Sequence, residues 1–183
     1  MRRNESPKKF ANDLLKRAQK CSRLFRRGAK QRTEAVRGIL SAMAYSRGLK
    51  FSPRRPRKRH EFLCDFAWMC WQKSHPLWLR RLVLAAECEW SNQGRDRSRQ
   101  VLYDFRKLLP LKARFKLCIY QVRRRSPEGL AEKLRKKAFI ALEGYQDHTP
   151  GECYLLLELD RRKEPTARIY QWHLGMKRFS SLP

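Results

Sequence analysis

The segment L-V-L-A-A-E-C-E-W, at Leu82–Trp90, constrains the fold of this chain more than any other part of the sequence. Side chains of a β-strand alternate between its two faces, so a strand here places Glu87 and Glu89 on the same face. Two neighbouring carboxylates on an apolar strand repel each other, and removing them from water is costly. A positive group must therefore compensate them, either a divalent metal ion or a basic side chain.

Basic residues greatly outnumber acidic ones, and the two kinds are separated along the chain. The 183 residues include 44 Lys and Arg against 17 Asp and Glu, which is a formal net charge of +27. Residues 1–32 hold twelve of the basic residues, and Lys50–Arg59 holds six and no acid. Four acids are instead gathered in His60–Glu89, among the apolar strands. This separation predicts an acidic site within a basic surface that binds a phosphate backbone. The alternatives are that the whole proteome is basic or that the protein is ribosome-associated.

The periodicity of apolar residues predicts the elements in the order helix, helix, strand, strand, helix, strand, helix, strand, strand. The predicted ranges are Phe10–Phe25, Thr33–Gly48, His60–Trp71, Leu79–Trp90, Val101–Leu109, Phe115–Gln121, Pro127–Glu143, Cys153–Leu159 and Ala167–Trp172. A helix between the second and third strands favours a mixed, partly parallel sheet with helices on both faces. The predicted class is therefore α/β. A basic helical N-terminal arm is expected at residues 1–31, followed by one domain at residues 32–183.

The cysteines and the hydropathy pattern bear on the compartment. The six cysteines are scattered without a C-x-x-C pair. This spacing argues against a zinc cluster and is typical of small buried side chains in a reducing cytosol. No apolar run reaches the length of a membrane-spanning helix, and the N-terminus has no apolar signal region. We expect a cytoplasmic, nucleoid-associated protein.

The chemistry of phosphodiester hydrolysis explains why acids would gather in such a basic chain. A bound Mg²⁺ ion neutralises the attacked phosphate and its nucleophile, and its preferred ligands are oxygens of carboxylates and water. Asp65 is predicted in the middle of its strand, on the face that it shares with Leu63 and Ala67. Pairing with the neighbouring strand would bring Asp65 and Glu87 to one Mg²⁺ or Mn²⁺ ion.

The order of these features resembles the PD-(D/E)XK, or restriction-endonuclease-like, nuclease superfamily. An acid on one strand is followed by Glu-x-Glu on the next, then by a helix and a further strand. The segment V-L-Y-D-F-R-K-L-L-P-L-K-A-R-F-K-L-C-I-Y-Q, which follows A-E-C-E-W-S-N, is similar to the helix–strand half of such a core. The resemblance covers roughly Thr33–Trp172. It implies a restriction-endonuclease-like fold in which Asp65, Glu87 and the backbone carbonyl of Cys88 bind the metal.

The chain departs from the family pattern at Glu89, where the family usually carries a lysine. Some members that are similar in other respects have Glu at this position. A lysine that has migrated to the following helix is another way to complete the site, and Lys107 is the candidate. Helical-wheel geometry places Lys107 nearly opposite the apolar stripe, which favours a solvated lysine. Lys107 is nevertheless kept as the candidate lysine, so the predicted catalytic set is Asp65, Glu87, Glu89 and Lys107.

The predicted partner is nucleic acid, with DNA as the expected substrate and a homodimer as a possible assembly. The residues expected to contact it belong to the Pro-Arg-rich loop and to the end of the first helix. They are Arg54, Arg55, Arg57, Lys58, Arg59, Arg23, Arg26 and Arg27.

Three functions remain open from the sequence. The first is a Mg²⁺-dependent DNA nuclease, and the second is a non-catalytic nucleic-acid-binding protein on a degenerate nuclease fold. The third is a basic helix, Phe10–Phe25, that docks on an anionic membrane or a partner protein. In a purely structural alternative, the two glutamates pair with Arg80, Arg81 or Lys116.

Overall fold

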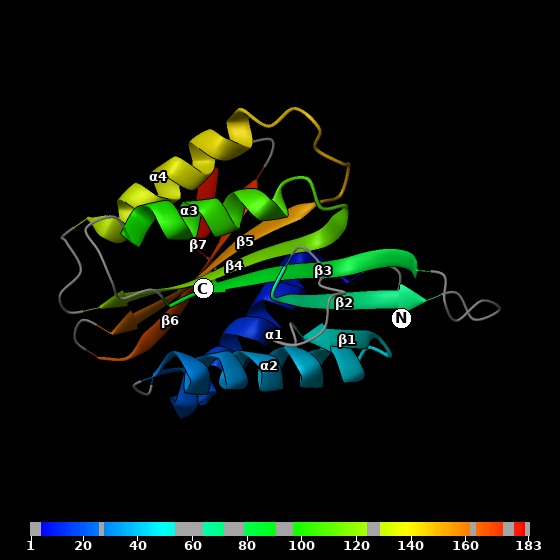
Figure 1. The fold of residues 1–183 in the computed structure, drawn as a ribbon, viewed down its shortest axis with the longest axis horizontal. Helices are drawn as coiled ribbons and strands as arrows, with labels where there is room; N and C mark the ends of the chain where they lie inside the picture. The colour runs from blue at the N-terminus through cyan, green and yellow to red at the C-terminus, as the bar shows by residue number, and fades with distance from the viewer. Residues whose placement is uncertain are drawn as a thin grey trace.

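The apolar runs of the sequence form one seven-stranded sheet with helices on both faces (Figure 1). The computed structural model describes residues 5–25, 28–53, 64–71, 79–90, 97–123, 129–161, 164–173 and 178–181. The helices are α1 (Pro7–Lys20), the short 3-10 helix η1 (Ser22–Phe25), α2 (Ala29–Tyr45), α3 (Arg97–Leu108) and α4 (Leu130–Glu143). The strands are β1 (Lys50–Pro53), β2 (Phe66–Trp71), β3 (Leu79–Glu89), β4 (Ala113–Arg123), β5 (Cys153–Arg161), β6 (Thr166–His173) and β7 (Arg178–Ser181). The predicted α/β class is confirmed.

The strands lie in the sheet in chain order, from β1 at one edge to β7 at the other. The pairs β3–β4 and β4–β5 are parallel, and all the other neighbours are antiparallel. The two parallel pairs are those joined through α3 and α4, because parallel neighbours need a crossover connection. The predicted mixed sheet is therefore confirmed. Both crossover helices lie side by side on one face of the sheet (Figure 1).

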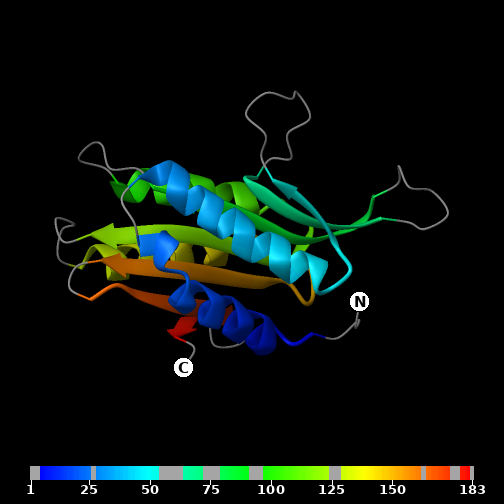
Figure 2. The same ribbon diagram turned by 90° about the horizontal axis from the view of Figure 1, so that it is seen from below.

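Alternating side chains divide the core into two layers, one on each face of the sheet. Leu84 and Ala86 of β3 belong to the layer that α1 and α2 cover. Ala85 belongs to the layer that α3 and α4 cover, and strand alternation places Glu87 on that same face,. Figure 2 shows α1 and α2 together on the near side of the sheet, with α3 and α4 behind it. The predicted acids therefore face α3.

Helix α1 is part of the hydrophobic core, which corrects the prediction of a separate arm at residues 1–31. The Phe10 side chain is fully buried. Its ring stacks on Phe115 of β4 with 4.2 Å between ring centroids, and it meets the edge of the Trp68 ring of β2 at 5.5 Å. The lysines and arginines lie on the other side of this amphipathic helix, so a high local charge and a buried face occur together.

Polar contacts fix the beginning of α1 to the end of α2. The Ser6 hydroxyl caps α1 by accepting a hydrogen bond from the Lys9 backbone N–H at 3.2 Å,. The Arg47 guanidinium donates to Glu5 at 2.6 Å and to Asp13 at 3.0 Å. These part-buried ion pairs bridge two helices that are far apart in sequence, so they add to the packing of the α1 face.

Two local features differ from the prediction. Helix α2 begins at Ala29, after Gly28 with φ of 99°, a conformation that favours glycine,. Thr33, predicted as the first residue of this helix, therefore lies inside it, and its hydroxyl donates to the Ala29 carbonyl at 3.0 Å. The edge strands β1 and β7 were not predicted, because four residues are too few for a periodic pattern and Pro53 argues against a strand away from an edge,.

Candidate active site

Antiparallel pairing of β2 and β3 brings Asp65 and Glu87 together. Phe66, the first residue of β2, pairs with Ala86 of β3. Asp65 directly precedes that pair, and one of its carboxylate oxygens accepts a hydrogen bond from the Cys88 backbone N–H at 3.0 Å. The prediction that Asp65 lies in mid-strand is wrong, because β2 begins only at Phe66. Its proximity to Glu87 is nevertheless as predicted.

Glu87 is a buried carboxyl near the carboxyl end of β3. Its exposed fraction is 2 %, although it carries a titratable group. The neighbouring strand β4 runs parallel to β3, and Glu87 is in register with Cys118. In open α/β sheets, ligand sites form at the carboxyl ends of parallel strands. Burial at this end of the sheet makes Glu87 the centre of the candidate site.

Lys107 reaches Glu87 from the last turn of α3. Its Nζ atom lies 2.8 Å from Glu87 Oε1 and 3.0 Å from Asp104 Oδ1. The side chain is 30 % exposed. The expectation of a solvated lysine is therefore wrong. A helical wheel shows only where Lys107 lies relative to the apolar stripe of its own helix. The position of α3 against β3 decides which groups the long side chain reaches.

Asp104 is a site residue that the sequence analysis did not identify. It is 5 % exposed, and its other oxygen lies 3.5 Å from the Gln100 side-chain amide. The signal was present in the sequence, because Asp104 falls between Val101 and Leu108 on the apolar stripe of the helix,. An acid in a buried stripe, with a lysine three residues further on, indicates a charged group directed into the core.

Burial and neighbouring charges shift the pKa values of the central pair. The pKa of Glu87 is raised to about 8, mainly by burial and also by the nearby Asp65 carboxylate, while the Lys107 ammonium at 2.8 Å opposes this rise,. Burial lowers the pKa of Lys107, but hydrogen bonds to Glu87 and Asp104 outweigh this effect and raise it overall. Lys107 is therefore a permanent cation at neutral pH, and Glu87 exchanges its proton near the pH at which enzymes work.

The remaining predicted residues of the strand lie beside this centre. Glu89 is half-buried at the end of β3, on the face of Glu87 and in register with Tyr120 of β4. The Cys88 side chain packs against the opposite layer, with α1 and α2. Only the backbone of Cys88 therefore faces Asp65.

Lys116, offered as a partner of the two glutamates, instead belongs to a separate buried cluster. Its Nζ atom donates to the Leu109 carbonyl at 2.8 Å, to Glu152 at 2.9 Å and to the Tyr154 hydroxyl at 3.0 Å. The cluster lies near the beginning of β4 and β5, at the other end of the parallel strands. Arg80, also offered as a partner, is exposed near the beginning of β3. We assign Lys116 a structural role, since its donors are used within the core.

A second buried carboxylate, Glu158 of β5, connects α4 to the sheet. It is fully buried and accepts hydrogen bonds from the Tyr120 hydroxyl at 2.9 Å and from Arg135 of α4 at 3.0 Å. Glu158 is not among the predicted site residues, although a lone acid in L-L-L-E-L is a strong signal. The contacts hold α4 in a defined position beside α3.

The basic residues predicted to contact nucleic acid are mostly outside the described residues. Arg54, Arg55, Arg57, Lys58, Arg59, Arg26 and Arg27 lie there. Arg23 is exposed on η1, on the side of the sheet that carries α1 and α2.

The raised pKa of Glu87 predicts that the protein loses stability as the pH rises from about 5 to 8. A carboxyl whose pKa is higher in the folded chain keeps its proton more tightly there. The free energy of unfolding therefore falls between the ordinary value of 4.5 and the folded value of about 8,. The slope cannot exceed about 1.4 kcal/mol per pH unit for one group. Urea unfolding in EDTA across this range measures it, and Glu87→Gln should flatten the slope. An equal slope in both proteins would contradict the assignment.

No family model matches the chain, and no curated protein matches it. In the described part of the chain, no helix has both the length and the apolar character needed to cross a membrane.

Proposed function

We propose that this chain is a Mg²⁺-dependent nuclease that hydrolyses phosphodiester bonds of DNA on a restriction-endonuclease-like core. The observation that carries the proposal is the position of Lys107, whose Nζ atom lies 2.8 Å from the buried carboxyl of Glu87. In this proposal, Lys107 of α3 takes the role of the lysine that the family usually carries at the position of Glu89. The order of an acid before β2, Glu-x-Glu on β3, then α3 and β4 also supports the resemblance to PD-(D/E)XK nucleases.

The residues at this position fit a hard divalent cation. Mg²⁺ typically takes one or two carboxylates and keeps several waters, so Asp65 and Glu87 are a sufficient protein set. Among the described residues, no three His, Cys, Asp or Glu side chains form a metal-binding group. The further protein ligand would be a backbone atom. The resemblance assigns this role to the backbone carbonyl of Cys88, a residue whose backbone N–H contacts Asp65 at 3.0 Å. Mn²⁺ would use the same oxygen ligands.

The burial and charge of each side chain indicate its role in the proposed reaction. A bound Mg²⁺ ion supplies charge neutralisation and a bound water of lowered pKa. Lys107, a cation held by Asp104, stabilises negative charge that develops on the phosphate,. Glu89 is more exposed than Glu87, and we assign it as the general base that accepts a proton from the attacking water,. Asp104 and Gln100 are positioning residues, because they touch Lys107 or its partner.

One observation favours the alternative of a non-catalytic nucleic-acid-binding protein. The Lys107 ammonium contacts Glu87 Oε1, the oxygen that a metal ion would also need as a ligand. In a degenerate site, this contact between Lys107 and Glu87 would take the place of the metal permanently. Metal binding therefore separates the two functions before any cleavage is measured.

Incubation with supercoiled plasmid and with circular single-stranded DNA tests the proposal. We expect cleavage of DNA with Mg²⁺ or Mn²⁺ and none with EDTA. Calorimetry should also show Mg²⁺ binding with release of a proton, because a protonated Glu87 must ionise to become a ligand,. Proton release is read from titrations at pH 7 in two buffers of different ionisation enthalpy. Absence of both cleavage and metal binding would leave the non-catalytic alternative.

A further inference from the structure

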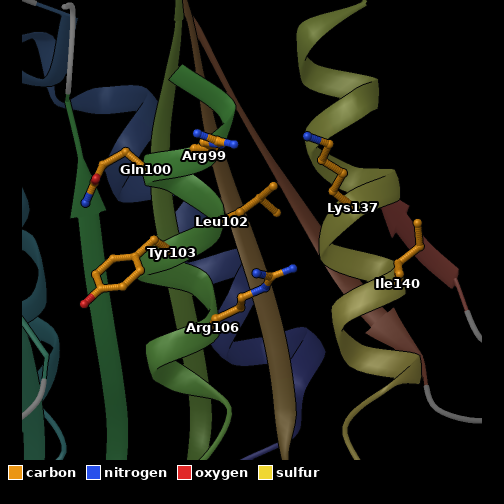
Figure 3. A pocket seen from close by; sticks show the side chains of 7 residues that line it. All are labelled: Arg99, Gln100, Leu102, Tyr103, Arg106, Lys137 and Ile140. Atoms are coloured by element: carbon orange, nitrogen blue, oxygen red, sulfur yellow. The ribbon is translucent and has the colours of Figure 1, made fainter. Parts of the chain in front are cut away.

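A groove with a volume of about 540 Å³ separates α3 from α4 on the outer surface of the molecule (Figure 3). Its walls include the basic residues Arg99 and Arg106 of α3 and Lys137 of α4. None of the described residues that line it is acidic. The size is that of a site for a small organic ligand or for one unit of a polymer. The chemistry of the groove favours an anionic ligand.

The same groove presents large apolar side chains to water. Tyr103 of α3 is 62 % exposed, and Ile140 of α4 is 65 % exposed. In the described part of the chain, only two other large apolar side chains are exposed, Tyr45 and Leu79. Two of these four side chains therefore line the groove that holds the three cations, with Tyr103 on the side of α3 away from α4 (Figure 3). Exposed aromatic and aliphatic groups next to basic groups are the combination that binds nucleic-acid bases and phosphates together.

The groove and the candidate active site lie on the two sides of α3. Figure 3 shows Arg99 and Arg106 directed toward α4, and Gln100 and Tyr103 directed toward the side of β3. Gln100 contacts Asp104, which in turn holds Lys107. The Lys107 Nζ atom lies 5.7 Å from the centre of the Tyr103 ring. A ligand that crosses the outer face of α3 at Tyr103 therefore touches both the groove and the site.

We propose that this groove binds a single strand of the nucleic acid on which the active site acts. In this arrangement, Arg106, Lys137 and Arg99 contact backbone phosphates, and an unpaired base stacks on Tyr103. A base in a duplex is already stacked and paired, so a stacking contact selects a single-stranded segment. The inference rests on the proposed function for its substrate, but not for its binding residues.

The arrangement of α3 and α4 is suited to a preformed binding surface. The Arg135 side chain of α4 is bound to the buried Glu158, and its guanidinium stacks over the Tyr170 ring at 4.4 Å. These contacts fix the helix that carries Lys137 and Ile140 against the sheet. A groove between two fixed helices loses little conformational freedom when a ligand binds.

Fluorescence polarisation with a labelled single-stranded oligonucleotide tests the inference, with the matching duplex as a second probe. The measurements are made in EDTA, so that binding does not depend on cleavage. The groove variant is Arg106→Gln with Lys137→Gln, and the matched control is Lys9→Gln with Lys16→Gln. The control lysines are exposed on α1, across the sheet from the groove. Both variants lose the same charge, so a difference between them reports position.

We expect the groove variant to lower the slope of log affinity against log salt by about 1.4, since each single-strand phosphate contact contributes about 0.7. Tyr103→Ala should weaken single-strand binding about tenfold, because stacking on an aromatic side chain is lost. The control variant should keep the slope of the parent. Equal losses in the groove and control variants would overturn the inference, as would an effect on duplex binding alone. If the parent never cleaves DNA but the groove variants lose binding, the proposed function fails and the groove assignment stands.

Discussion

Replacing Glu87 with Gln is expected to lower Mg²⁺-dependent cleavage by roughly three orders of magnitude while nucleic-acid binding is retained. The amide keeps the shape of the side chain and a hydrogen-bonding oxygen near Lys107, but it cannot serve as an anionic metal ligand. Asp65→Asn should have a similar effect, because Asp65 is the second carboxylate of the predicted pair. Plasmid nicking rates and oligonucleotide polarisation measure the two properties. Glu143→Gln, an exposed position at the end of α4, is the matched control.

Thermal melts distinguish a metal site from a structural ion pair in the same variants. Burial and Asp65 already disfavour a charged Glu87. Glu87→Gln should therefore melt at or above the temperature of the parent in EDTA at pH 8. In a structural ion pair, loss of one buried partner would cost roughly 3–5 kcal/mol. The nuclease proposal would be contradicted if Glu87→Gln melted at a much lower temperature than the parent in EDTA and Mg²⁺ did not raise the melting temperature of the parent.

Deleting residues 1–27 is expected to abolish cooperative folding of the chain. The deletion removes the buried face of α1, which is formed by Phe10, Ala11, Leu14, Leu15 and Ala18. Phe10→Ala alone should cost about 3–5 kcal/mol, because its ring fills the space between Phe115 and Trp68,. A domain of ordinary stability, about 5–15 kcal/mol, cannot lose the whole face and remain folded.

Urea unfolding of Phe10→Ala and of the exposed control Lys16→Ala measures the smaller change. Circular dichroism during heating of the truncated chain measures the larger one. A truncated protein with a cooperative melt near that of the parent would restore the model of a separate basic arm. Lys16→Ala should change the free energy of unfolding by no more than about 0.5 kcal/mol, as expected of an exposed position.

Elements with strong local periodicity were predictable, and so was part of the site. The run Leu82–Trp90 contains enough apolar residues to predict a strand, and period-two alternation places Glu87 and Glu89 on one face without further information. The position of Asp65 near Glu87 also followed, because the two apolar runs are close in sequence and were expected to pair. Each of these inferences depends on neighbours in the chain or on adjacent strands.

The remaining parts depended on packing between distant elements. Whether Lys107 points into water or toward Glu87 depends on where α3 crosses β3. The pattern within residues 97–108 indicates only that Asp104 faces the core. Phe10 is apolar in either case, but only the packing of α1 on the sheet shows that Phe115 and Trp68 are its neighbours. Local sequence thus determined the strands and the face of the acids, because alternation is a short-range property of the backbone. The tertiary structure decided which cation meets Glu87 and which helix belongs to the core, because those contacts join residues that only folding brings together.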